Sequence, residues 1–151
     1  MQKFYIVSII GTMKILIKNK YILFSKLVED KPEKYFDQNS KSIELATEIN
    51  DYLSGDSKKL SSKYKMYGTS FQLKVWNIIR EIPYGETRTY GEIASLINHP
   101  GSCRAVANAC GQNKLMLFVP CHRVIGKNNI GGYKWGSDTK DYLLELENYC
   151  C

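Results

Sequence analysis

Residues 89–110, TYGEIASLINHPGSCRAVANAC, contain the pattern that decides the fold. Thr89 and Glu92 have the spacing of a capping box, in which a hydroxyl and a carboxylate satisfy the unpaired amide donors at a helix start. Apolar residues then continue to Ile97. The stretch therefore begins with a short helix that ends at about Ile97.

A turn and a second helix follow. Residues 98–101, NHPG, favour a tight turn, Ser102 is a candidate N-cap, and Gly111 can end a helix that runs from Cys103 to Cys110. Two short helices joined in this way form a helix-turn-helix, whose second helix enters the major groove of DNA. Many similar helix pairs bind no DNA, so the spacing leaves both readings open.

A further helix is predicted just before this pair. Thr69 or Ser70 can cap it, and Pro83 stops it. Its apolar residues share one face: Phe71, Val75, Ile78, Ile79 and Ile82. The second part of the chain is thus mostly helical.

The first part of the chain favours strands. Three apolar runs, interrupted at Gly11-Thr12 and Asn19-Lys20, predict an antiparallel meander: Phe4 to Ile10, Met13 to Ile17 and Tyr21 to Leu27. Helical spacing of apolar residues from Ile43 to Leu53 then predicts a helix that Gly55 ends.

The polar stretch Ser54 to Lys65 indicates a linker or an exposed loop. We therefore expect an α+β scaffold domain over residues 1–62 and a second domain over residues 63–151. The predicted fold class is α+β, in which a small strand-rich N-terminal domain precedes a mostly helical, winged helix-turn-helix domain.

Composition excludes several classes of protein. The 151 residues are 44% hydrophobic and 24% charged, which argues against disorder and against a large multidomain protein. The longest apolar run, Phe4 to Ile10, is far too short to cross a bilayer, and no signal-peptide cleavage site follows it.

The five cysteines are odd in number and lie in the last third, which favours a reducing, cytoplasmic location over a disulfide framework. No Cys or His precedes His99, so the first two thirds of the chain cannot hold a thiolate or imidazole zinc site, and no structural metal is expected.

The net charge of +6 is concentrated in one stretch. Between Thr87 and Lys134 there are six basic residues, and Glu92 is the one acidic residue. This stretch is suited to face phosphates, although a solvated lysine-rich surface has the same composition.

The residues with the clearest chemistry are Cys121 and His122, in the segment PCHRV at 120–124. An imidazole can withdraw the proton of a neighbouring thiol, and the thiolate is the reactive nucleophile. The alternative is a buried cysteine beside a histidine with structural hydrogen bonds.

This segment resembles the active-site signature of the O6-alkylguanine-DNA alkyltransferases, also called methylated-DNA-protein-cysteine methyltransferases. Four other segments are similar to this family in the same order: residues 69–76, 83–94, 104–113 and 140–147. Five ordered segments are far more specific than a single signature. Residues 1–62 contain no motif that matches.

The resemblance implies single-turnover repair of DNA. Cys121 would take an alkyl group, mainly methyl, from O6 of guanine, with His122 accepting the thiol proton through a water and Glu147 stabilising the imidazolium. Tyr90 would donate a hydrogen bond to the leaving guanine, and Asn113 would orient the site. A thioether is a poor leaving group, so each molecule would react once, and no cofactor is implied.

The implied partner is double-stranded DNA that contains O6-alkylguanine, with O4-alkylthymine as a second candidate lesion. The protein would act as a monomer and would not bind a membrane. The lesion must leave the base stack to be reached, and Arg104 matches the residue that fills the gap. The other candidate DNA-binding residues are Ser102, Ala105, Thr89 and Ala107.

The candidate pocket residues are Val124, Tyr133, Lys134, Trp135 and Cys110. Family members usually have Pro after the hinge asparagine, where this chain has Lys114, and a small residue in the binding loop, where it has Trp135. The width of the pocket therefore stays open, and so does the choice between Trp135 as a steric gate and as a stacking platform.

Two other functions remain as alternatives. A non-catalytic alkyltransferase-like or regulatory protein would also grip DNA through Arg104, but in the alkyltransferase-like case the position of Cys121 is not a cysteine. A Cys-His hydrolase would use Cys121 and His122, but it gives no reason for Arg104 in a helix-turn-helix.

Overall fold

The computed structural model of this chain describes residues 1–29 and 39–149. The chain folds as two compact units. The first comprises Met1–Lys65 and Lys114–Met116, and the second comprises Met66–Asn113 and Leu117–Cys151. The division after Lys65 lies three residues beyond the boundary expected from the polar stretch, and the short segment at Lys114 was not foreseen.

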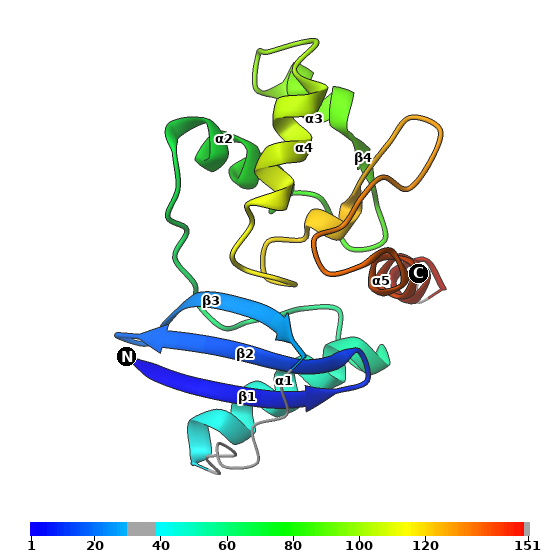
Figure 1. The fold of residues 1–151 in the computed structure, drawn as a ribbon. Helices are drawn as coiled ribbons and strands as arrows, with labels where there is room; N and C mark the ends of the chain where they lie inside the picture. Colours follow the sequence, from blue (N-terminus) through cyan, green and yellow to red (C-terminus); the bar gives the residue numbers. More distant parts are fainter. Residues whose placement is uncertain (30–38, 150–151) are drawn as a thin grey trace. The chain divides into compact units, whose positions relative to one another are not determined.

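The first unit is a three-stranded antiparallel sheet with one helix (Figure 1). Its strands are β1 (Gln2–Ser8), β2 (Gly11–Lys18) and β3 (Tyr21–Val28), and its helix is α1 (Ser40–Ser54). The predicted meander and helix are confirmed. The expected first strand, Phe4 to Ile10, was placed two residues too late, because Ile9 and Ile10 form the turn and Gly11 pairs with Ser8 as the first residue of β2.

Apolar side chains at alternate positions of β2 form part of the core of this unit. Met13, Ile15 and Ile17 are fully or almost fully buried on one face of the strand, and Leu45 and Ile49 of α1 are fully buried as well. Each large aliphatic side chain that leaves water contributes about 1.5 to 3 kcal/mol, so this face holds the helix and the sheet together.

Both ends of α1 have local caps. The Asn39 side chain accepts a hydrogen bond from the Ser42 amide at 2.9 Å. At the other end Gly55 has φ of 85°, a left-handed conformation that glycine adopts without a steric penalty, and its amide donates to the Tyr52 carbonyl.

The second unit contains the helix-turn-helix. Its elements are α2 (Ser70–Ile79), β4 (Arg88–Thr89), α3 (Tyr90–Leu96), α4 (Cys103–Gly111), the 3₁₀ helix η1 (Cys121–Arg123), β5 (Val124–Ile125) and α5 (Ser137–Tyr149). Helices α2, α3 and α4 contact one another (Figure 1). The strands β4 and β5 pair in parallel, and residues 126–136 continue as a loop.

Capping boxes start two of these helices, as the sequence predicts for α3. Thr69 forms a box with Gln72 at α2, and Thr89 forms one with Glu92 at α3. The turn before α4 uses left-handed backbone at Asn98 and Gly101, two residue types that tolerate it.

Two local predictions are wrong. Ser102 makes no side-chain cap bond, because its ψ of 31° is far from the extended backbone that lets Thr69 and Thr89 cap their helices. Helix α2 ends at Ile79 and not at Pro83, because the amide of Ile82 already bonds the Ile79 carbonyl in a tighter turn. No helix in the two described ranges is long and apolar enough to cross a membrane.

Candidate active site

Cys121 is the first residue of η1 and follows a buried segment of the chain. Residues 115–120 are all buried, and Cys121 itself is 4% exposed. The Asn113 side chain donates a hydrogen bond to the Val119 carbonyl at 2.9 Å, and the Cys121 amide bonds the same carbonyl at 2.8 Å. Asn113 therefore fixes the backbone that presents the thiol.

The next residue of η1, His122, is joined to α5. Its Nε2 lies 2.8 Å from Oε1 of Glu147, which is 25 residues further along the chain. Arg123 donates to both carboxylate oxygens of Glu147, at 2.7 to 3.1 Å, and to the Ile82 carbonyl. All three side chains are buried, so the geometry of this cluster is fixed by packing.

The charge states within the cluster follow from these contacts. Burial opposes ionisation of Glu147, but hydrogen bonds and charges from His122 and Arg123 together lower the pKa of Glu147 to about 2. Burial lowers the pKa of His122, with Glu147 opposing that shift. At neutral pH the site thus pairs a neutral imidazole with a carboxylate.

The hydrogen bond to Glu147 also sets the tautomer of His122. A carboxylate only accepts, so Nε2 carries the proton and Nδ1 keeps a lone pair. Nδ1 is buried and has no hydrogen-bond partner among the described residues. His122 can therefore accept a proton at Nδ1 while Glu147 stabilises the charge that results.

Cys121 lines a pocket of about 230 Å³. The pocket is lined by Tyr90, Ala107, Cys110, Gly111, Cys121, Gly132, Tyr133 and Lys134. Burial, followed by the charges of Cys110 and Cys121, raises the pKa of Tyr90, so its phenol stays protonated and can donate. The pocket therefore places a sulfur nucleophile and a phenol donor around one small volume.

The thiol of Cys121 is protonated at rest. A hydrogen bond with Cys110 and burial raise its pKa well above the ordinary value. A hydrogen bond from Asn113 and the charge of Lys140 oppose this rise. The nucleophile therefore needs a base at the moment of reaction.

Lys140 is a member of the site that the sequence analysis did not single out. Its side chain is fully buried, and its Nζ donates to the carbonyls of Val124 at 2.7 Å and Gly132 at 2.9 Å. The same ammonium lies 5.9 Å from the centre of the Tyr90 ring. A signal was present, because Lys140 shares a helix face with Leu143 and Glu147, and a lysine on a buried face needs partners.

The structure brings some of the predicted pocket residues together and not others. Tyr133, Lys134 and Cys110 line the pocket, and so does Ala107, which was expected to contact DNA. Val124 takes part through its carbonyl, which accepts from Lys140. Trp135 is not among the lining residues and instead packs edge-on against Tyr133, with ring centres 5.3 Å apart.

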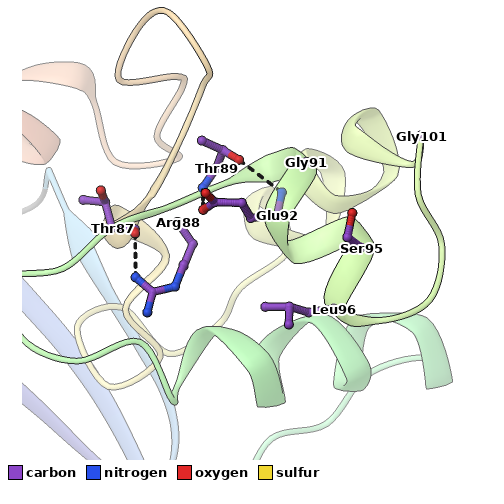
Figure 2. A pocket seen from close by; sticks show the side chains of 8 residues that line it. All are labelled: Thr87, Arg88, Thr89, Gly91, Glu92, Ser95, Leu96 and Gly101. Carbon is purple, nitrogen blue, oxygen red and sulfur yellow. Dashed lines mark hydrogen bonds between the residues drawn. The ribbon is translucent and has the colours of Figure 1, made fainter.

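The candidate DNA-binding residues lie on the helix-turn-helix. Arg104 and Ala105 are exposed on α4, and Ser102 precedes that helix. Thr89 lies at a second, larger pocket of about 740 Å³, lined by Thr87, Arg88, Thr89, Gly91, Glu92, Ser95, Leu96 and Gly101 (Figure 2). Its lining includes no cysteine or histidine, so the smaller pocket at Cys121 is the candidate reaction site.

The chain is similar in sequence to proteins of one family. The family model of the 6-O-methylguanine DNA methyltransferase DNA-binding domain matches residues 70–149. A methylated-DNA–protein-cysteine methyltransferase of Methanosarcina acetivorans is 42% identical over 134 residues, which are 87% of this chain and 86% of that protein. A probable methyltransferase of the same kind from Acanthamoeba polyphaga mimivirus is 58% identical over 83 residues, which are 55% of this chain and 56% of that protein.

Solved structures show the same fold. The crystal structure of a Mycobacterium tuberculosis O6-methylguanine methyltransferase has a TM-score of 0.87 and 34% identity, covering 99% of this chain and 94% of that one. A crystal structure of Mycobacterium tuberculosis OGT in complex with DNA gives the same values. Fold and site thus define a helix-turn-helix protein with a buried cysteine at a small pocket. The chain belongs to the methylated-DNA–protein-cysteine methyltransferase family, which confirms the resemblance.

Proposed function

We propose that this chain repairs double-stranded DNA by moving an alkyl group, mainly methyl, from O6 of guanine to Sγ of Cys121. One observation supports this above all: Cys121 lines a small pocket and is followed by His122, whose Nε2 is bound to Glu147. This is the arrangement that activates a sulfur nucleophile.

The transfer is a direct displacement at the alkyl carbon. The sulfur forms a bond to that carbon, the bond from carbon to O6 breaks, and the electron pair stays on guanine. The thiol proton passes through a water to Nδ1 of His122, and Glu147 stabilises the imidazolium. Tyr90, which is protonated, donates to the guanine and so stabilises the leaving group.

The protein is consumed in this reaction. The product is a thioether, whose sulfur is a poor leaving group, so the alkyl group stays on Cys121. Each molecule therefore accepts one group, and repair is stoichiometric.

The partner DNA must present its lesion outside the base stack, because O6 is flanked by stacked bases in the duplex. Arg104 supports this requirement, since it is exposed on α4 and its guanidinium can stack in the gap and bond the unpaired base. Thr89, Ser102 and Ala105 would meet the DNA backbone nearby. O4-alkylthymine carries the same kind of exocyclic O-alkyl group and is a second candidate lesion.

The acceptor must be a reduced thiol, so we place the protein in a reducing compartment, the cytoplasm. Cys103, Cys110 and Cys121 are unbridged in the structure. We further propose that a monomer acts, because the groups that perform the displacement all come from one chain.

The test is intact mass and a peptide map after incubation with double-stranded DNA that contains O6-methylguanine. The native protein should gain one methyl group, on Cys121. Cys121→Ser should bind the DNA and gain none, because a hydroxyl is far less acidic and less nucleophilic than a thiol. Cys103→Ser, at an exposed thiol, should react like the native protein.

Other outcomes would reject the proposal. Methyl on a different cysteine would reject Cys121 as the acceptor. Binding without any gain of mass would support the binding-only reading, and repeated turnover on an amide substrate would support a hydrolase.

A further inference from the structure

The pocket at Cys121 contains two thiols. Cys110 comes from the last turn of α4 and Cys121 from η1, and both line the same 230 Å³. Cys110 lies close enough to Cys121 to raise the pKa of the Cys121 thiol. The proposed displacement uses only Cys121, so the close partner Cys110 is left without a role.

The two thiols line one small pocket, as a disulfide between them requires. A disulfide has a sulfur separation of about 2.05 Å, so the Cys110 and Cys121 sulfurs would have to approach each other within that pocket. Cys110 lies next to Gly111, the final residue of α4, where helix ends adjust most easily. A Cβ on Gly111 would meet nothing within 4 Å, so the residue beside Cys110 is not packed on that side.

Cys103 differs in each of these respects. It is exposed, it does not line the pocket, and its sulfur would stand 3.7 Å from a Cβ on Gly91 of α3. Cys110 follows it seven positions later in the same helix, which puts their Cα atoms about 10 Å apart and beyond disulfide reach. Cys103 is therefore a natural control.

We propose that Cys110 and Cys121 form a reversible disulfide under peroxide, which switches off the acceptor thiol until a reductant restores it. This inference rests on the proposed function, because it assigns a regulatory partner to the proposed acceptor. Cys110 is the more exposed of the two thiols and meets the oxidant first.

The chemistry balances with hydrogen peroxide as the oxidant. The Cys110 sulfur takes one oxygen to become a sulfenic acid, and the peroxide leaves as water. The Cys121 sulfur attacks that sulfenic sulfur, its proton goes to His122 and then to the departing hydroxide, and a second water leaves. Two thiols lose two electrons in total, and one peroxide gains them.

A reversible disulfide would protect the acceptor thiol of a protein that can react only once. A sulfenic acid without a thiol beside it proceeds to sulfinic acid, which ordinary thiol reductants cannot reverse. A disulfide partner in the same pocket would stop oxidation at a reversible stage.

The sequence makes the test direct, because trypsin cuts after Arg104, Lys114 and Arg123. Cys110 and Cys121 are thus alone in separate peptides, residues 105–114 and 115–123. The full-length protein is treated with hydrogen peroxide, blocked with iodoacetamide and digested without reductant. The expected result is one cross-linked pair of these two peptides, which dithiothreitol separates.

Variants test whether the cross-link between Cys110 and Cys121 controls methyl acceptance. Peroxide should abolish methyl acceptance by the native protein and by Cys103→Ser, and dithiothreitol should restore it in both. Cys110→Ser and Cys110→Ala should form no link, and their loss under peroxide should not be recovered. A link between Cys121 and any other cysteine, or full recovery of the Cys110 variants, would overturn the proposal.

The cross-link is measured without DNA, so its outcome is independent of the proposed repair activity. A cross-link in a protein that accepts no methyl group would reject the proposed function and support the proposed disulfide. Methyl acceptance without a cross-link would support the proposed function and reject the disulfide.

Discussion

Gly131 and Tyr90 lie so close together that a Cβ on Gly131 would stand 2.6 Å from the phenol oxygen. Gly131 also has φ of 74°, in the left-handed region that favours glycine. The backbone of the loop therefore limits where the Tyr90 ring can lie, while Lys140 approaches the same ring.

Gly131→Ala should displace Tyr90 and slow the transfer of methyl from DNA by about 10- to 100-fold, since each factor of ten is about 1.4 kcal/mol in the barrier. The measurement is the single-turnover rate on O6-methylguanine DNA, together with binding of undamaged DNA, which should change little. The matched control is Gly132→Ala, because a Cβ there meets nothing within 4 Å. Equal slowing in both variants would show that the loop itself, and not its contact with Tyr90, controls the rate.

Glu147 should govern the stability of the protein in acid. Its pKa falls from 4.5 to about 2 on folding, so the folded state binds fewer protons between these values than the unfolded state. The stabilisation is complete above pH 4.5 and is lost as the pH falls towards 2, and it amounts to about 3 kcal/mol.

Glu147→Gln should therefore flatten the free energy of unfolding in urea between pH 4.5 and pH 2, besides lowering stability at neutral pH. Glu145→Gln, at an exposed position on the same helix, should keep the acid dependence of the native protein. A variant at Glu147 with an unchanged slope would mean that other carboxylates set the acid limit.

Arg104→Ala should separate base capture from chemistry. Extruding a base costs a few kcal/mol, so the loss of a side chain that fills the gap should slow reaction with DNA by about 10- to 100-fold. Reaction with O6-methylguanine as the isolated base should stay nearly unchanged. Arg80→Ala, at another exposed arginine, is the control, and equal slowing on both substrates would place Arg104 in the chemistry or the fold.

Trp135 packs edge-on against Tyr133, and Tyr133 lines the pocket. If the indole holds Tyr133 in place as part of a steric gate, Trp135→Gly should raise the ratio of rates for benzylated over methylated guanine. A misfit of this size is worth about 1 to 3 kcal/mol. A ratio that falls would favour the indole as a stacking platform for the base.

The local elements were the most predictable part of this protein. The capping box at Thr89 and the left-handed residues of the turn act within a few residues, so α3 and its turn could be inferred without tertiary information. Ser102 shows the limit of this reasoning, since a cap also needs an extended backbone that the preceding turn does not supply.

The sequence by itself determined which reactive groups exist and which are neighbours along the chain, above all Cys121 beside His122. Only tertiary structure brings Glu147 against His122, as the resemblance implies, buries Lys140, and puts Cys110 into the pocket of Cys121. The physical reason is that a side chain's burial and long-range partners depend on how helices pack, and packing is set by the whole apolar surface. The pKa values that control the chemistry follow from that burial, so they too belong to the folded chain.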